Sequence, residues 1–338
     1  MAVEYYVPKE VSSILDLVDT YLRSRQASQK GDRKYHMYHP SEWGKCLRAQ
    51  QYKHYAQLGL ISVEYSDVKS QMLRIWGKGH NMHNRWSHYF DDMGNILLGR
   101  WKCKNPFCSM FDAKGAVISS PTKSFIDFLY AKKETRIYGG DNELVFRPER
   151  CVCGCSDFEY LESTVLDKSV NIKGHADIVL DCTNMDVEQF KNVRSTFNRD
   201  FLPINGKKVV IDMKTIRERQ WKNQLIAKGP HKEYLVQLTI YCHILDCDYG
   251  MLIYENKDNS EIRSYIVPRN DEWWEIIRYQ AKTMMQMTAD RKLPPPKPLS
   301  KTNWSCKNCE FRDICHKSKI WQDPNLADKR RKFYKSLL

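Results

Sequence analysis

The sequence predicts an α/β fold in which helices flank a mixed sheet, and three observations lead to this class. The 338 residues are 42% hydrophobic and 28% charged, a composition that excludes a disordered or fibrous chain. Apolar, β-branched runs over 170–181 and 207–214 are typical of strands. A helical pattern over 231–247 follows, and then a strand pair over 249–256 and 261–267. This order of elements indicates a mixed sheet with helical cover.

Helical periodicity marks three further segments. One helix is expected after Pro8, because apolar side chains recur there on one stripe. They are Val11, Ile14, Leu15, Val18, Tyr21 and Leu22. A second helix is expected over about 67–92, and a third over about 271–292, where the run Pro294–Pro296 ends it.

Composition divides the chain into four expected parts. A helical part over 1–92 is followed by a cysteine-rich insertion over 93–165, where Gly, Pro and paired cysteines interrupt any long period. The predicted core is 166–293, within which 182–206 is polar and irregular and is expected to be a loop. The last part, 294–338, carries three clustered cysteines and a basic tail.

Charge narrows the class of partner. The chain has 54 basic and 41 acidic residues, a formal net charge of +13, which favours a polyanion such as nucleic acid, although such an excess also serves solubility alone. No apolar run reaches the ~18 residues of a membrane span, and the beginning of the chain lacks a signal-peptide pattern. We therefore expect a cytoplasmic protein that has no membrane partner.

The 12 cysteines are clustered, and without a secretory signal such clusters are more typical of metal ligands than of disulfides. Cys103 and Cys108, with two of Cys151, Cys153 and Cys155, form one candidate tetrahedral zinc site. The pattern C-x-C-G-C leaves open which of the last three is spare. Trp101 and the Cys153–Gly154 turn make this stretch similar to a zinc ribbon, and the alternative is a set of ordinary buried thiols.

A candidate hydrolytic site combines acids, an imidazole and a lysine. Asp212 and Lys214 are two apart on a predicted strand, so their side chains point to the same face. With Asp177 and His83 they offer the oxygen and nitrogen ligands that suit Mg²⁺ or Mn²⁺. Such a metal lowers the pKa of a bound water, and the ammonium of Lys214 can orient that water. The alternative is a pair of strand-end aspartates and a surface lysine.

Four short motifs occur in a fixed order along the chain. They are G-x-x-x-H (Gly79 to His83), G-x-x-D (Gly174 to Asp177), D-x-K (Asp212 to Lys214) and Q-x-x-x-Y (Gln237 to Tyr241). This set resembles the PD-(D/E)XK nuclease superfamily in its RecB-like branch, which includes CRISPR-associated exonucleases. The resemblance covers about 41–91 and 160–315, and it implies a restriction-endonuclease-like fold.

The resemblance assigns a role to each motif residue. It implies that the metal ligands are His83, Asp177, Asp212 and, as an additional one, the Met213 carbonyl. Lys214 becomes the catalytic lysine. Gln237 and Tyr241 orient the site or touch the DNA backbone, and plain helix packing is the alternative for these two.

Residues 41–52 (SEWGKCLRAQQY) resemble the stretch that precedes the core in iron–sulfur members of this branch. Those members close the cluster with C-x2-C-x5-C, the spacing found after the core of this chain. The resemblance implies a structural 4Fe–4S cluster, with a zinc site or free thiols as the alternative. Its ligands would be Cys46, Cys306, Cys309 and Cys315.

Basic and aromatic residues alternate directly after the predicted active-site strand, over 214–222 (KTIRERQWK). Arg217, Arg219 and Lys222 are expected to meet phosphates, and Trp221 to stack on an exposed base. The alternative is a solvated loop that the tryptophan anchors.

The resemblance therefore implies an exonuclease that cleaves single-stranded DNA ends in recombination, repair or replication in prokaryotes or bacteriophages, with a helicase or recombination protein as a possible partner. A structure-selective endonuclease is the enzymatic alternative, and RNA stays open as a substrate. A nucleic-acid-binding module without catalysis is the third reading. The intact Asp212–Lys214 pair argues against it.

Overall fold

The computed structural model describes residues 18–19, 21–24, 37–63, 70–94, 96–108, 114–115, 135–183, 204, 206–298 and 300–334. Most of the helix expected after Pro8 and most of the loop expected over 182–206 lie outside these residues. Among the helices that are described, none combines the length and apolar character needed to cross a membrane.

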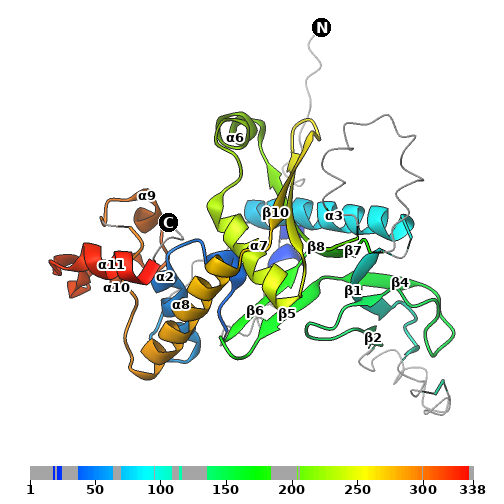
Figure 1. Cartoon of the computed structure of the whole chain (residues 1–338), viewed down its shortest axis with the longest axis horizontal. Helices are drawn as coiled ribbons and strands as arrows, with labels where there is room; N and C mark the ends of the chain where they lie inside the picture. The colour runs from blue at the N-terminus through cyan, green and yellow to red at the C-terminus, as the bar shows by residue number, and fades with distance from the viewer. Residues whose placement is uncertain are drawn as a thin grey trace, which may run out of the picture.

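A mixed sheet forms the centre of the molecule (Figure 1). Its strands run in the order β10-β9-β8-β7-β1-β2, and β3 and β4 also pair with β1. Only β8 and β9 are parallel among these pairs; the other pairs are antiparallel. The bounds are β1 Leu97–Cys103, β2 Ile137–Tyr138, β3 Val145–Phe146, β4 Phe158–Leu161, β7 Ile178–Asp181, β8 Lys208–Ile216, β9 Tyr249–Asn256 and β10 Ile262–Pro268. The predicted mixed α/β class is confirmed.

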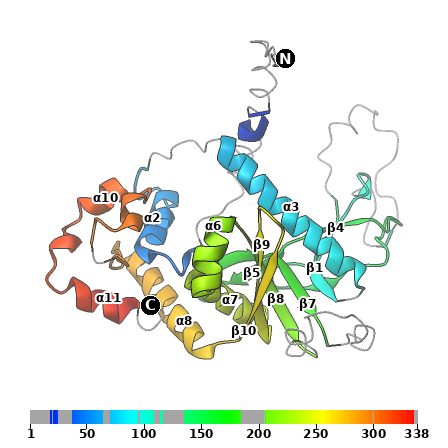
Figure 2. The same cartoon turned by 90° about the horizontal axis from the view of Figure 1, so that it is seen from above.

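Two long helices cover opposite faces of this sheet, α3 (Ser70–Asp92) and α7 (Lys232–Ile244). Alternate residues of β8 point to opposite faces, so Ile211 joins a core cluster with Met82 of α3, and Val210 joins another with Leu238 of α7. Figure 2 shows α3 lying across the sheet. Both helices were predicted, and they place their polar side chains beside β8.

The predicted strand over 170–181 is in fact two strands in two sheets. β6 (Ile172–Ala176) pairs with β5 (Ser163–Asp167) in a separate two-stranded sheet, whereas β7 pairs with β8 and β1. The chain bends at Asp177, between β6 and β7. Position 174, just before the bend, is occupied by glycine. A Cβ there would lie only 2.9 Å from the ring of Pro40, so a larger residue would not fit without a shift. The junction of the two sheets thus carries the acid of the G-x-x-D motif.

The expected insertion over 93–165 begins inside the central sheet. β1 pairs with β7 through Leu97 and Leu98, so this strand belongs to the core and not to a peripheral lobe. The cysteine-bearing turns extend from the far end of β1 (Figure 1).

Elements from early and from late in the chain meet on one side of the molecule (Figures 1 and 2). The N-terminal elements there are η2 (Pro40–Glu42) and α2 (Leu47–Gln57). The C-terminal ones are α8 (Asp271–Ala289), α9 (Trp304–Lys307), α10 (Arg312–His316), η7 (Lys319–Gln322) and α11 (Leu326–Tyr334). The Tyr334 hydroxyl accepts a hydrogen bond from the Leu47 N–H at 3.2 Å, and the Gln280 amide accepts one from Trp43 Nε1 at 2.9 Å. Early and late segments are therefore packed as one unit.

Candidate active site

An ion pair on β8 is the centre of the candidate site. Lys214 Nζ lies 2.7 Å from Oδ2 and 2.8 Å from Oδ1 of Asp212, which is only 1% exposed. The two side chains share a face, as their spacing of two on a strand predicts. Burial lowers the pKa of Lys214, but the charges of Asp212 and Asp177 outweigh it, so the pKa is raised. The lysine therefore stays cationic.

Asp177 and His83 lie next to this pair. His83 Nδ1, on α3, is 3.4 Å from Asp177 Oδ1. The other oxygen, Oδ2, accepts a hydrogen bond from the Met213 backbone N–H at 2.7 Å. The bend between β6 and β7 thus brings Asp177 against β8, beside the Asp212–Lys214 pair.

A third acid, Glu162, belongs to the same group, and no motif pointed to it. Its Oε1 lies 3.6 Å from His83 Nδ1, and one ligand atom from each of Glu162, His83 and Asp177 falls within 4.8 Å of the others. Glu162 precedes β5, whose antiparallel register pairs Ser163 with Ala176. One step further along this register, residue 162 faces residue 177. The sequence could have indicated Glu162 only through the register of β5 against β6.

The charges of this group perturb one another. Burial and the neighbouring Asp212 raise the pKa of Asp177 to about 7. Burial lowers the pKa of His83, but Glu162 and Asp177 outweigh it and the pKa is raised. Burial raises the pKa of Glu162, but His83 outweighs it and the pKa is lowered. Closely placed acids with opposed shifts are typical of functional sites.

These residues fit a divalent cation. Nδ1 of His83 is buried and makes no hydrogen bond in the described part of the chain, although two carboxylates face it. Such an orphaned nitrogen beside carboxylate oxygens is the mixed donor set that Mn²⁺ and Mg²⁺ sites use.

Gln237 and Tyr241, both on α7, position Asp212 of β8 through hydrogen bonds. The Gln237 amide donates to Asp212 Oδ1 at 3.1 Å and to the Tyr241 hydroxyl at 2.8 Å. That hydroxyl in turn donates to the His175 carbonyl at 2.8 Å. Gln237 is 4% and Tyr241 2% exposed, so contact with a DNA backbone, one of the two roles expected for them, does not fit their burial.

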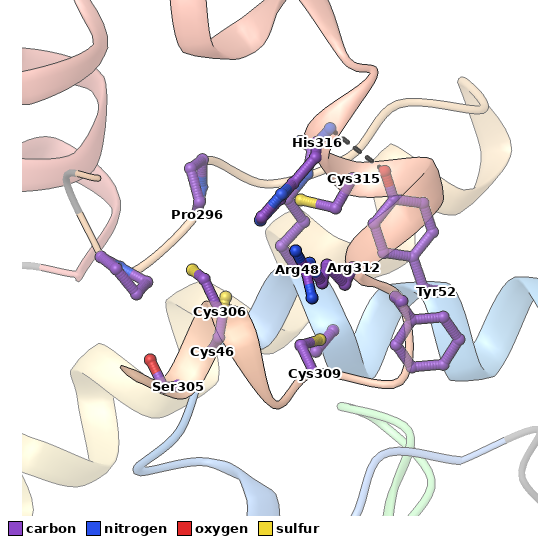
Figure 3. Close-up of a pocket in the computed structure, with 13 residues that line it drawn as sticks. Cys46, Arg48, Tyr52, Pro296, Ser305, Cys306, Cys309, Arg312, Cys315 and His316 are labelled. Carbon is purple, nitrogen blue, oxygen red and sulfur yellow. Dashed lines mark hydrogen bonds between the residues drawn. The ribbon is translucent and has the colours of Figure 1, made fainter. Parts of the chain in front are cut away.

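The expected cluster ligands line one pocket (Figure 3). Cys46 reaches it from the beginning of α2, and the other three thiols come from the region of α9 and α10. They are Cys306, Cys309 and Cys315. Arg48 supports the wall, because its guanidinium donates to the Pro294 carbonyl at 2.8 Å and to Ser318 Oγ at 3.0 Å.

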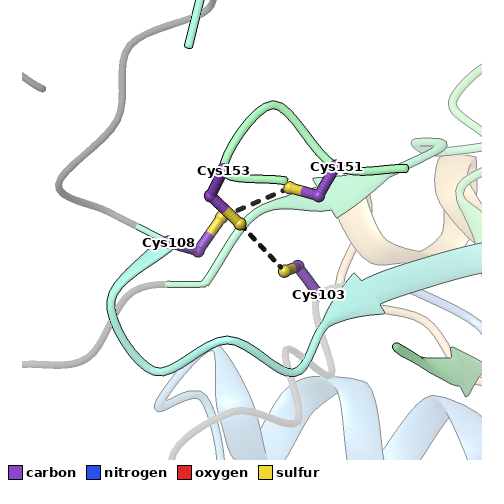
Figure 4. Close-up of side chains that lie close together, drawn as sticks. All are labelled: Cys103, Cys108, Cys151 and Cys153. Atoms are coloured by element: carbon purple, nitrogen blue, oxygen red, sulfur yellow. Dashed lines mark hydrogen bonds between the residues drawn. The ribbon is translucent and has the colours of Figure 1, made fainter. Parts of the chain in front are cut away.

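A second set of thiols is much tighter (Figure 4). Cys103 Sγ lies 3.6 Å from Cys153 Sγ, Cys108 Sγ lies 3.5 Å from Cys151 Sγ, and all four sulfurs fall within 4.8 Å of one another. Sulfurs of a tetrahedral zinc site, with Zn–S of about 2.3 Å, are roughly 3.8 Å apart. Cys155 lies outside the quartet and accepts from the Asp157 N–H at 3.3 Å instead.

The segment after β8 differs from the expected loop. It forms α6 (Glu218–Gln220) and a π-helical turn, η6 (Trp221–Ile226). Trp221 is 5% exposed and packs in a core cluster with Leu225, so the prediction that it stacks on a base is wrong. Basic and aromatic residues alternate over 214–222 because an amphipathic turn buries its tryptophan and exposes its cations. The exposed ones are Arg217, Arg219 and Lys222.

Arg217 belongs to a group of three cations from three elements. Burial and the charges of Arg217 and Lys78 lower the pKa of Lys257. Lys78 is on α3, and the two others directly follow the parallel strands β8 and β9, where the Lys257 N–H donates to the Ile216 carbonyl at 2.8 Å. Across the described ranges, no carboxylate lies within 4.0 Å of any of the three charged groups. Lys78 and Lys257 carry no signal in the sequence, because only the packing of α3 and β9 beside β8 brings them near Arg217.

One comparison with known proteins covers the β8 part of the site. A family model for the PD-(D/E)XK nuclease superfamily matches residues 200–316, which include Asp212, Lys214, Gln237 and Tyr241. This match indicates a metal-dependent nuclease. No curated protein matches the chain. A solved structure titled "Crystal structure of SSO0001" has a TM-score of 0.40 and 14% identity, over 88% of this chain and 96% of that one.

Proposed function

We propose that this protein is a divalent-metal-dependent DNA nuclease that removes nucleotides from the ends of single strands. One observation carries the proposal: the ion pair of the buried Asp212 with Lys214 lies beside Asp177. The nuclease family model covers Asp212 and Lys214. A nucleic-acid-binding module has no need of a half-buried lysine that is paired with a buried acid.

The proposed metal ligands are His83, Asp177, Asp212 and the Met213 carbonyl, and the ion is Mg²⁺ or Mn²⁺. A cation bound there supplies an activated water and stabilises negative charge on the phosphate. The orphaned Nδ1 of His83 and the raised pKa of Asp177 support this assignment, since a cation resolves both.

Lys214 is the proposed catalytic cation of the protein itself. Its ammonium is held at Asp212 and lies 4.8 Å from the centre of the Tyr234 ring, so it keeps one position and its charge. A fixed ammonium there orients the attacking water and offsets the charge that develops on the phosphate. Gln237 and Tyr241 act as positioning residues, because they hold Asp212 through hydrogen bonds.

The proposed path of the DNA backbone runs over the cations beyond β8 and β9. Lys78, Arg217 and Lys257 repel one another, no carboxylate of the described residues lies within 4.0 Å of their charges, and a phosphate relieves that repulsion. Arg219 and Lys222 extend the path, although Lys222 also pairs with Glu218 at 2.7 Å. We assign the activity to recombination, repair or replication in a prokaryotic or phage-infected cytoplasm, with a helicase or recombination partner.

We propose that the pocket of Figure 3 holds a 4Fe–4S cluster that staples the two chain ends. Its four thiols are not among the described groups whose ligand atoms all lie within 4.8 Å, so they are spread more widely than a single zinc ion requires. Thiolates are the usual ligands of such clusters. The role is structural, because phosphodiester hydrolysis transfers no electrons.

We further propose that the compact quartet of Cys103, Cys108, Cys151 and Cys153 binds one structural Zn²⁺. The four-part organisation of the chain, over 1–92, 93–165, 166–293 and 294–338, stays our proposal, with β1 as the strand through which the zinc part joins the core.

Digestion of end-labelled linear and of circular single-stranded DNA tests the function. We expect the wild-type protein to degrade linear strands only when Mg²⁺ or Mn²⁺ is present and to leave circles intact, and Asp212→Asn to be inactive. Cleavage of circles indicates the endonuclease instead. A wild-type protein that contains its metals and degrades neither substrate contradicts the proposal.

A further inference from the structure

Glu162 is the one acid of the active-site group that no motif assigns. We propose that its carboxylate is a further protein ligand of the divalent cation, so that the α3 side of the site is a trio of Glu162, His83 and Asp177. This inference rests on the proposed function, because it concerns the same metal centre.

The distances within the trio suit one small cation. His83 Nδ1 is 3.4 Å from Asp177 Oδ1 and 3.6 Å from Glu162 Oε1. Adjacent ligands of an octahedral ion with bonds of about 2.1 Å are roughly 3.0 Å apart, and opposite ones roughly 4.2 Å. The three donor atoms, all within 4.8 Å of one another, therefore need to move by only tenths of an ångström to share an ion.

Nδ1 of His83 distinguishes a metal site from a plain ion pair. Both carboxylates approach this nitrogen, yet neither makes a hydrogen bond with it, and the atom is buried. A buried nitrogen left unpaired is destabilising, so facing acceptors normally close to hydrogen-bond distance. A cation between the three side chains satisfies all of them after shifts of only tenths of an ångström.

The backbone of the trio is fixed from outside the site. The Glu162 carbonyl accepts a hydrogen bond from Arg100 Nε at 3.2 Å, and the Asp177 carbonyl accepts one from the Tyr160 hydroxyl at 3.1 Å. Met213 holds the second oxygen of Asp177 and thereby turns the first toward His83. Outer contacts of this kind are what orient metal ligands before the ion arrives.

The trio also explains the arrangement of Asp212. Lys214 and Gln237 both bind its carboxylate, so it is less available than a free acid. With Glu162 in the ligand set, the cation meets two acids and an imidazole on the α3 side, and Asp212 completes the site from β8. Asp177 lies between His83 on the α3 side and Asp212 on β8. His83 faces its carboxylate, and the charge of Asp212 raises its pKa.

Titration of the full-length protein with Mn²⁺, followed by the loss of the free-ion EPR signal, tests this assignment. We expect Glu162→Gln to weaken Mn²⁺ binding by tenfold or more, and Asp177→Asn to abolish it. The matched control is Glu159→Gln, since Glu159 is an exposed acid on β4 that only pairs with Lys102 at 3.7 Å. Its affinity should equal that of the wild type.

Three outcomes are distinct. The inference is supported if Glu162→Gln weakens Mn²⁺ binding and Glu159→Gln does not. Equal affinity in Glu162→Gln and Glu159→Gln overturns it and leaves the proposed nuclease site intact. A wild-type protein that binds no Mn²⁺, or binds it as well after Asp177→Asn, overturns both. If Glu162→Gln fails to fold, Glu162→Asp replaces it, and its shorter side chain should weaken binding; unchanged affinity then overturns the inference.

Discussion

The Asp177 carboxylate accepts a hydrogen bond from the Met213 backbone N–H at 2.7 Å, which joins the bend after β6 to the strand of Asp212 and Lys214. This bond spans 36 residues of sequence and fixes one oxygen of Asp177, so the other points at His83. The site is therefore organised around a contact between this bend and β8, which sets the spacing of Asp177 and Asp212.

Lys214→Met should lower the rate of DNA cleavage by about 10²–10⁴-fold, because a positioned ammonium beside the reacting phosphate is lost. Mn²⁺ affinity should persist, since the lysine is no metal ligand. The control is Lys207→Met, which removes an exposed lysine just before β8 that pairs with Asp248 at 3.7 Å. Single-turnover digestion measures both variants. A Lys214→Met enzyme as fast as Lys207→Met contradicts the catalytic role.

Metal affinity should rise with pH through about 7, where the buried Asp177 loses its proton. Without metal, the folded protein binds more protons at Asp177 than the unfolded chain between pH 3.8 and about 7. The contribution of this group to the free energy of unfolding therefore falls as pH rises through that window, and metal binding removes the penalty.

Thermal unfolding at pH 6 and pH 8, with and without Mn²⁺, measures this effect. The increase in Tm caused by Mn²⁺ should be larger at pH 8 for the wild type. For Asp177→Asn, in which Mn²⁺ binding is expected to be abolished, Mn²⁺ should not raise Tm at either pH. A wild-type increase that is greater at pH 6 rejects the assignment.

Cys46→Ser should remove most of the roughly four irons per chain and lower Tm, because the thiol joins α2 to the C-terminal helices. Cys155→Ser is the matched control, since Cys155 lines neither that pocket nor the zinc quartet. Iron and sulfide analysis after anaerobic purification gives the answer. A stable Cys46→Ser protein with a full cluster refutes the proposal that Cys46 ligates a cluster that joins α2 to the C-terminal helices.

Zinc content separates the two neighbouring cysteines of the C-x-C-G-C pattern. Cys153→Ser should lose the single bound zinc, and Cys155→Ser should keep it, because only Cys153 lies with the other three sulfurs. Both variants carry the same chemical change two residues apart. Loss of zinc from both, or from Cys155→Ser alone, is inconsistent with this quartet.

Removal of two cations from the proposed DNA path should reduce the salt dependence of binding. For single strands, each lost phosphate contact lowers the slope of log affinity against log salt by about 0.7. The variant is Arg217→Ala with Lys257→Ala, and the control is Lys282→Ala on α8, an exposed lysine outside the group. Fluorescence anisotropy at several salt concentrations measures the slope, and an unchanged slope excludes this path.

Local sequence was sufficient for the helices α3, α7 and α8, for the strands β8, β9 and β10 and for the β8 motif, because each follows from a period of 2 or 3.6 residues. It was insufficient at Asp177, since a single strand predicted over 170–181 hides the switch from one sheet to another. Glu162 was missed for the same reason: its role depends on the register of β5 against β6.

Trp221 shows the opposite error. Its basic neighbours favoured an exposed, base-stacking role, yet an amphipathic turn of this composition equally buries its one large apolar side chain. Exposure of an aromatic residue depends on the surface that the rest of the fold offers it, here the cluster around Leu225.

Anomalous diffraction at the manganese edge, from crystals grown with Mn²⁺, tests the metal centre most directly. We predict a peak within ligand distance of His83 Nδ1 and Asp177 Oδ1, next to the Asp212 carboxylate. A well-occupied manganese elsewhere, with these side chains empty and unmoved, contradicts the account.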